Sequence, residues 1–179
     1  MTKLKKVLLG LLLLTSCEMD VNDRDHAAYL INEINHQISN EMVKDKQLYL
    51  IGVGGSSMLG IDYRMLSFSY YRDKELKIEE ARKDMAEVIC KYLKAINQEK
   101  ELRPFLRNYP FDSSNIEITL FVHDKKGNKV PQGSLTLIEA VDGKISYYVA
   151  PFEVKSEPIL EETFEEALEK VQALANKSE

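Results

Sequence analysis

The fold class of this chain is indicated most directly by residues 135–150. They read Leu135-Thr-Leu-Ile-Glu-Ala-Val141-Asp142-Gly143-Lys144-Ile-Ser-Tyr-Tyr-Val-Ala150. Two runs of mostly apolar residues flank Asp142-Gly143. A type I′ turn needs positive φ at both of its central positions, and Asp-Gly is one of the pairs that supply it most readily. The stretch therefore predicts a β-hairpin with strands over 135–141 and 144–150.

Strand patterns continue on the N-terminal side of this hairpin. From 115 to 123 the sequence alternates, with Ile116, Ile118, Leu120 and Val122 in one phase, and Glu117, Thr119, Phe121 and His123 in the phase that we expect to face solvent. The segment 47–54 is almost continuously apolar. The segment 61–71 alternates with a change of phase between Met65 and Leu66, which predicts a β-bulge there.

Three other segments carry apolar residues at the spacing of an amphipathic helix: 25–44, 77–101 and 160–176. We expect Pro104 to end the second helix, because proline cannot continue one. The pairs Glu161-Glu162 and Glu165-Glu166 then belong to the solvated face of the third helix.

The predicted element order, α-β-β-α-β-β-β-α, is that of an α+β fold. Hairpins favour an antiparallel sheet with one face in water. We therefore expect a two-layer sandwich of about five antiparallel strands, with three helices on one face. No repeat or change of composition divides residues 26–179, which are enough to build a single hydrophobic core without disulfides.

The charge balance limits the classes of partner. The chain of 179 residues has 24 Lys and Arg against 29 Asp and Glu, a formal net charge of −5. A nucleic-acid-binding surface needs an excess of basic side chains, so we expect no nucleic-acid partner. Its two cysteines exclude a disulfide-dense scaffold.

The N-terminus has the pattern of a secretory signal. Lys3, Lys5 and Lys6 precede an apolar run over 7–14. At about 1.5 Å per residue this run is too short to cross ~30 Å of hydrocarbon. We interpret it as the apolar core of a signal peptide. The alternative is a buried N-terminal helix.

The next residues, Leu14-Thr15-Ser16-Cys17, resemble a bacterial lipobox, the maturation site of lipoproteins. This resemblance covers only residues 1–17 and assigns no family to the mature domain. It implies that the signal peptide 1–16 is removed and that Cys17 becomes the first mature residue, carrying acyl chains such as palmitate. The alternative is an ordinary secretory signal in which the cysteine occurs by chance.

Removal of residues 1–16 leaves 21 of the 24 basic side chains against all 29 acidic ones, a formal charge of −8. We expect 17–25 to form a short acidic tether between the anchor and the domain. The resemblance places the chain in the bacterial envelope, with the outer membrane as the default and the periplasmic or surface face left open. The expected partners are the membrane, through the acyl chains on Cys17, and another envelope or host protein.

Patterns for catalysis are weak. Gly52-Val53-Gly54-Gly55-Ser56-Ser57 lacks the third glycine and the following helix of a dinucleotide-binding loop, so we interpret it as a connection between strands. Ser56 or Ser57 as the nucleophile of a serine hydrolase stays an alternative, although neither lies in a G-x-S-x-G motif. We expect no catalytic residue, no metal and no cofactor, and we expect Cys90 to be a buried, inert thiol.

Two segments are candidate partner-binding sites. The segment 103–111 combines arginines, aromatics and prolines, as the centres of protein interfaces do, and its candidate residues are Arg103, Phe105, Arg107 and Tyr109. In the alternative, Phe105 and Phe111 pack in the core and the arginines are solvated. The second candidate is the solvated face of the sheet, with Phe121 and Tyr148.

These observations predict a lipid-anchored envelope protein with a non-catalytic binding or structural role. One alternative is a carrier that holds a small or lipid ligand between the helices and the sheet. A serine hydrolase is the less favoured alternative.

Overall fold

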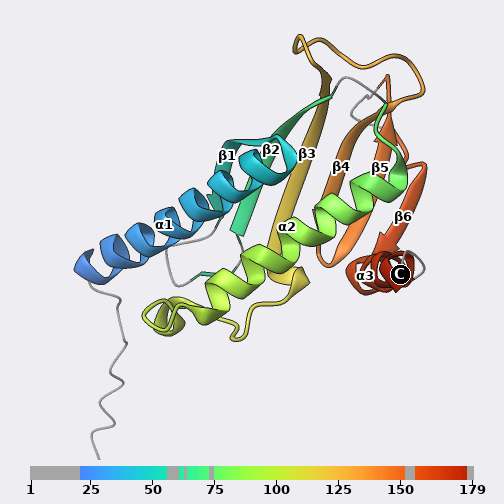
Figure 1. Cartoon of the computed structure of the whole chain (residues 1–179). Helices are drawn as coiled ribbons and strands as arrows, with labels where there is room; N and C mark the ends of the chain where they lie inside the picture. The colour runs from blue at the N-terminus through green and yellow to red at the C-terminus, as the bar shows by residue number, and fades with distance from the viewer. Residues whose placement is uncertain (1–20, 56–60, 63, 73–74, 152–155, 177–179) are drawn as a thin grey trace, which may run out of the picture.

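The computed structural model describes residues 21–55, 61–62, 64–72, 75–151 and 156–176 (Figure 1). The helices in these ranges are α1 (Val21–Lys46), α2 (Ile78–Gln98) and α3 (Phe164–Asn176). The strands are β1 (Leu48–Gly55), β2 (Arg64–Arg72), β3 (Ile116–Asp124), β4 (Leu135–Val141), β5 (Lys144–Val149) and β6 (Leu160–Thr163).

A single sheet contains these strands in chain order, from β1 at one edge to β6 at the other. The helices lie on one side of it (Figure 1). α1 packs over β1, α2 packs over β3 and β4, and α3 packs against α2, β5 and β6. The predicted α+β class is therefore confirmed.

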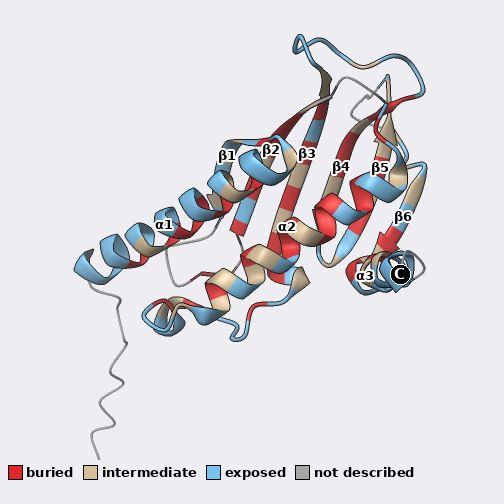
Figure 2. Cartoon of the chain, viewed as in Figure 1, coloured by how far each residue is buried: buried red, intermediate tan, exposed pale blue. Residues whose placement is uncertain are grey.

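The alternation along the strands decides which residues enter the core. In β3 the side chains of Ile116, Ile118, Leu120 and Val122 are buried, as predicted, and those between them are half-buried or exposed. α2 supplies the opposing layer with the buried residues Met85, Val88, Ile89 and Tyr92. Figure 2 shows the buried residues gathered along the inner strands and the facing side of α2.

The sheet is mixed, so the prediction of a purely antiparallel sheet is wrong. β2 and β3 are parallel neighbours, with Arg64 opposite Ile116. The other neighbouring pairs of described strands are antiparallel. The physical reason is the position of α2 between β2 and β3, because a helix that carries the chain back along the sheet lets both strands start at the same end.

The sheet has six described strands rather than about five, because residues 160–163 form β6 and not the first turn of a helix. The hydroxyl of Thr163 accepts a hydrogen bond from the backbone N–H of Glu166 (3.1 Å), and the Glu166 carboxylate accepts one from the backbone N–H of Thr163 (3.0 Å). This reciprocal capping box starts α3 at Phe164.

Glu162 therefore lies in a strand, and the prediction that it belongs to a solvated helix face is wrong. The side chains of Glu161 and Glu162 point to opposite faces of the sheet. Glu162 points under α2 and is 3% exposed, whereas Glu161 is exposed. Inside the core its carboxylate accepts hydrogen bonds from Arg82 Nε, Tyr147 Oη and Lys170 Nζ, each of 2.7 Å.

The turn between β4 and β5 has the predicted conformation. The φ angles of Asp142 and Gly143 are 49° and 74°, as a type I′ turn requires. The predicted bulge in β2 is wrong, because β2 pairs continuously with both neighbours at Met65 and Leu66. The change of phase arises before the strand, where Ile61 forms an isolated bridge with Leu106.

The ends of the first two helices differ from their predicted positions. α1 begins at Val21, inside the segment 17–25 that we expected to be a tether. α2 ends at Gln98, ahead of Pro104, and the chain then makes two short 3₁₀ helices, Arg103–Phe105 and Ser113–Asn115, before β3.

Cys90 is exposed, so its predicted burial is wrong. It lies two helical turns after the exposed Lys83, on the outer side of α2. Partial burial of the thiol and the charge of Glu87 nevertheless raise the pKa of Cys90. A thiol with a raised pKa is a poor nucleophile at neutral pH.

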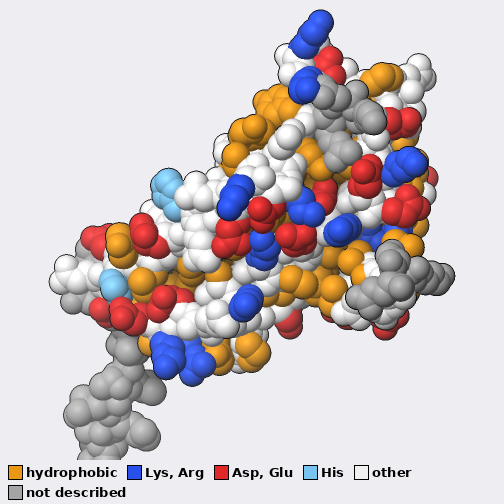
Figure 3. Space-filling view, in the orientation of Figure 1, with side chains coloured by type: hydrophobic (Ala, Val, Ile, Leu, Met, Phe, Trp, Pro, Cys, Tyr) orange, Lys and Arg blue, Asp and Glu red, His pale blue; other side chains and the backbone are white. Residues whose placement is uncertain are grey.

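Ion pairs join the C-terminal end of α1 to α2. The ammonium of Lys46 lies 3.0 Å from Asp84 Oδ1 and 2.9 Å from Glu87 Oε2. Asp84 also accepts a 2.7 Å hydrogen bond from the hydroxyl of Tyr70, so the sheet takes part in the same contact. Figure 3 shows acidic and basic side chains interleaved where the two helices meet.

Candidate functional site

The face of the sheet opposite the helices, which we call the open face, carries a row of rings across β1, β2 and β3. The ring centroids of Tyr49 and Tyr71 are 5.7 Å apart in an edge-to-face arrangement. Those of Tyr71 and His123 are 5.4 Å apart and stacked. Tyr71 stands directly opposite His123 in the parallel β2–β3 pair. Such ring pairs contribute roughly 0.5–1.5 kcal/mol beyond their buried area, so this row is preorganised.

A second group on the open face surrounds Leu137. In the strand register Phe121 of β3, Leu137 of β4 and Tyr148 of β5 stand side by side. Leu137 is only 3% exposed, although it is not part of the main core. Phe121 beside it is 38% exposed. The open face therefore has a small apolar layer of its own.

Glu139 marks the polar border of this layer. It lies on β4 opposite Ser146, in the same phase as Leu137. Burial raises the pKa of Glu139, and a hydrogen bond with Tyr148 offsets part of that shift. A carboxylate that is partly withdrawn from water is consistent with a crowded surface around Tyr148.

The segment between β3 and β4 builds a wall beside this layer. Asp124 holds its first turn, because its Oδ1 accepts hydrogen bonds from the backbone N–H groups of Lys126 (2.8 Å) and Asn128 (2.7 Å). The chain returns through a bridge between His123 and Lys129. Farther on, the backbone N–H of Gly133 donates to the carbonyl of Ala150 over 2.8 Å, which fixes the wall to the end of β5.

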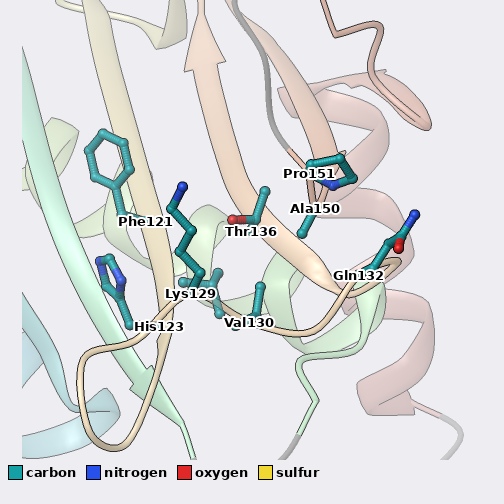
Figure 4. A pocket seen from close by; sticks show the side chains of 9 residues that line it. Phe121, His123, Lys129, Val130, Gln132, Thr136, Ala150 and Pro151 are labelled. Atoms are coloured by element: carbon teal, nitrogen blue, oxygen red, sulfur yellow. The ribbon is translucent and has the colours of Figure 1, made fainter.

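A cavity of about 450 Å³ lies between this wall and the sheet (Figure 4). Phe121 and His123 line it from β3, Lys129, Val130 and Gln132 line it from the wall, and Thr136, Ala150 and Pro151 line it from the far side. A second hollow of about 550 Å³ shares part of the wall and extends towards Glu75, Leu76 and Ser134.

The chemistry of the first cavity suits binding. Phe121, Val130 and Pro151 offer apolar surface, and Lys129 supplies a positive charge. The described lining contains one imidazole, His123, and no carboxylate, thiol or serine hydroxyl. Apolar walls with a few polar groups are typical of sites that hold a ligand or a partner side chain.

The segment 103–111 is held in place by contacts within the domain. The guanidinium of Arg103 lies 4.5 Å from the centre of the Tyr109 ring. Arg107 Nε is 2.9 Å from Asp62 Oδ1. Phe111 is 3% exposed and Phe105 packs partly against the core. Tyr109, with 44% exposure, is the aromatic residue of this segment that remains accessible.

The structure does not bring the two predicted candidate regions together. The segment 103–111 leads into the start of β3, whereas Phe121 lies five positions along that strand from Ile116, roughly 17 Å away at about 3.3 Å per residue. Arg103, Phe105, Arg107 and Tyr109 thus lie in the segment before β3, with Phe105 partly packed against the core, while Phe121 and Tyr148 belong to the open face.

Several predicted features fall outside the described residues: the signal peptide, Cys17, Ser56 and Ser57. The nearby glycines Gly52, Gly54 and Gly55 lie within β1. Among the described residues the next helix is α2, which begins at Ile78, and residues 56–60, which follow these glycines, lie outside the described ranges.

Within the described ranges, no three His, Cys, Asp or Glu side chains gather in a way that could hold a metal ion. No helix of those ranges has the length and apolar character needed to cross a membrane. Comparisons with protein-family models, curated proteins and solved structures find no match to this chain.

Sequence reasoning missed Tyr49, Tyr71, Leu137 and Lys129. The alternation of β2 placed Tyr71 in the phase opposite Leu66 and Phe68, but only the pairing of β2 with β3 puts it against His123. Leu137 could have been assigned to the solvated phase of its strand. Its burial depends on Phe121 and Tyr148, which come from two neighbouring strands.

Proposed function

We propose that this chain is a lipid-anchored protein of the bacterial envelope, and that it binds another envelope or host component without catalysis. The observation that carries the binding role is the open face, where exposed Tyr49 contacts Tyr71 and exposed Phe121 lines the cavity together with His123. Aromatic residues concentrated on an uncovered surface beside a cavity are typical of interaction sites.

The resemblance of Leu14-Thr15-Ser16-Cys17 to a lipobox supports the anchor. Three residues separate Cys17 from the start of α1 at Val21, so the anchor would hold that end of the molecule close to the membrane. The segment after α2 lies at the same end, since His26 Nε2 is 2.8 Å from Glu101 Oε2. The wall follows the far end of β3 (Figure 1), and the cavity lies beside the last residues of that strand, so both would face away from the membrane.

Photo-crosslinking in intact cells tests the binding role. A photoreactive amino acid replaces Tyr49, Phe121 or Tyr148 on the open face, and, for comparison, Phe105 or Tyr109 in the segment 103–111. We expect a discrete protein adduct from the open face. Leu174, which is 46% exposed on α3, is the matched apolar control. Adducts from 105 and 109 alone would move the site to that segment, and the absence of a protein adduct from every position would refute a protein partner.

The anchor is tested separately with Cys17→Ser. We expect this variant to lose incorporation of a fatty-acid probe and to leave the membrane fraction. If it remains labelled and membrane-bound, the proposed anchor is wrong.

A small-ligand carrier is the second candidate, and the cavity beside Lys129 is the observation that favours it. Its position on the open face differs from the expected pocket between helices and sheet. Native mass spectrometry of the mature protein would then detect a copurifying ligand, which Lys129→Ala together with Phe121→Ala should release. A spectrum with the protein mass alone would count against this candidate.

A further inference from the structure

The two edges of the sheet are protected very differently. β6 has four residues, includes Glu161 and Glu162, and passes directly into α3, which packs on it. β1 has eight residues, Leu-Tyr-Leu-Ile-Gly-Val-Gly-Gly, with no charged residue and no proline. Natural sheets protect their edges with charge, proline, short strands or a covering element, because an open edge pairs with other chains. β1 carries no protecting charge or proline.

The side chains of β1 are also accessible. Tyr49 is 43% exposed, Ile51 is 58% exposed and Val53 is 49% exposed. Leu48 at the start of β1 is buried, and each residue from Tyr49 to Gly55 is exposed or half-buried (Figure 2). The backbone of β1 pairs with β2 on its inner side. Among the described residues, no backbone hydrogen bond reaches its outer side.

We propose that the outer edge of β1 is a strand-addition site, which binds an extended, apolar segment of a partner protein with basic residues at its ends. The inference rests on the proposed binding function and names the mode of recognition. Main-chain hydrogen bonds to β1 supply affinity in this mode, and alternate side chains supply specificity. Tyr49 links the edge to the aromatic row, so an added strand extends the open face by one position.

Two observations favour a partner of different sequence over a second copy of this chain. With residues 1–16 removed as proposed, the chain has a formal charge of −8, which disfavours pairing with a second copy and favours a segment with basic ends. In addition, the register of β1 shifts between Leu50 and Gly52, near the middle of the strand. If two β1 strands paired antiparallel about a two-fold axis, the irregular positions of both strands would lie opposite each other at that axis. The ladder of hydrogen bonds between the two copies would be interrupted there.

Peptide binding to the mature full-length protein tests the site. The probe is a fluorescent peptide of alternating valine and threonine with lysines at both ends, and its anisotropy reports binding. We expect Ile51→Lys and Val53→Lys to weaken binding about tenfold or more, because a lysine on the edge repels the basic probe and obstructs pairing. Ile159→Lys is the matched control, since Ile159 is 52% exposed beside β6, and we expect it to leave binding unchanged.

Four results would overturn the inference. The first is a probe with a central proline that binds as well as the unbroken one, because proline removes a ladder hydrogen bond. The second is equal weakening by Ile159→Lys. The third is a concentration-dependent dimer in sedimentation, with β1 amides protected from hydrogen exchange, which would assign the edge to a second copy. Open-face crosslinks that persist in Ile51→Lys would leave the proposed function intact and refute strand addition.

Discussion

Arg82 of α2 donates a 2.7 Å hydrogen bond from its Nε to Oε1 of Glu162 on β6. Both side chains are buried, and they are 80 residues apart in the chain. Tyr147 and Lys170 complete the set of donors around this carboxylate. This cluster fixes the last strand and α3 to the helical layer, at the edge of the sheet far from the open strand β1.

The first prediction concerns Glu162→Gln. Removing one charge of a buried pair leaves the guanidinium of Arg82 without its counter-ion, and we expect a loss of about 3–5 kcal/mol in the free energy of unfolding. Urea denaturation followed by circular dichroism measures it. Glu161→Gln is the control: Glu161 is exposed, with Lys144 Nζ at 3.4 Å, so its loss should stay within about 0.5 kcal/mol. Equal losses would contradict a buried ionic cluster.

The second prediction is the pH dependence of that contribution. Burial by itself raises the pKa of Glu162, but hydrogen bonds from Arg82, Lys170 and Tyr147 outweigh it and hold the pKa below its usual value. The stabilisation is therefore present above the unfolded-state pKa of about 4.3 and is lost as the pH falls through the lower folded-state value. We expect the stability difference between wild type and Glu162→Gln to shrink on acidification. A difference that stays constant from neutral to strongly acidic pH would contradict this assignment.

The third prediction compares two buried arginines. Arg64 is 9% exposed and Arg82 is 8% exposed. Arg64 hydrogen-bonds Tyr92, yet its Nε has no partner, and no described carboxylate forms an ion pair with it. Nearby Asn35, which accepts a hydrogen bond from Tyr92 (3.0 Å), also has an unpartnered Nδ2.

A buried charge without a counter-ion lowers the stability of the folded state. Removing one partner of a buried ion pair also lowers it, because the other charge is left without its counter-ion. We therefore expect Arg64→Met to change the free energy of unfolding by less than about 1 kcal/mol or to raise it. Arg82→Met leaves Lys170 as the basic partner of Glu162. We expect this variant to lower the free energy of unfolding by about 3 kcal/mol. Thermal and urea denaturation of both variants make the comparison. A larger loss for Arg64→Met would show that Arg64 has an essential acceptor.

Local patterns made much of the fold predictable. The alternation from Ile116 to Val122 gave the correct buried phase of β3, and Asp142-Gly143 gave the correct turn. Both depend on residues that are close in sequence. The capping box formed by Thr163 and Glu166 was also a local signal, and it would have separated β6 from α3.

The pairing of distant segments was not predictable in this way. Nothing in the composition of β2 and β3 distinguishes a parallel from an antiparallel pair, because that choice depends on the path of α2. The contacts on the open face also depend on which strands pair. Phe121 could be assigned to it from the phase of its own strand, but the contact of Tyr71 with His123 depends on which strands become neighbours.

The fourth prediction concerns the turn at Gly143. Its φ of 74° lies in the left-handed region, and a Cβ at this position would approach Ser113 Oγ to 3.2 Å. Its carbonyl also accepts a 2.8 Å hydrogen bond from the backbone N–H of Phe164, the first residue of α3. We expect Gly143→Ala to lower the free energy of unfolding by about 1–2 kcal/mol, the usual cost of a side chain in this conformation.

Gly52→Ala is the matched control for this substitution. A Cβ at Gly52 would meet Ser67 Cβ at 3.6 Å, an ordinary contact, and the residue is not left-handed. Its replacement by alanine also reduces the entropy of the unfolded chain, so the variant should be as stable as wild type or slightly more stable. Urea denaturation of the two variants separates backbone strain from a general sensitivity of the sheet. Equal losses would show that the strands, and not the turn, limit the stability of this domain.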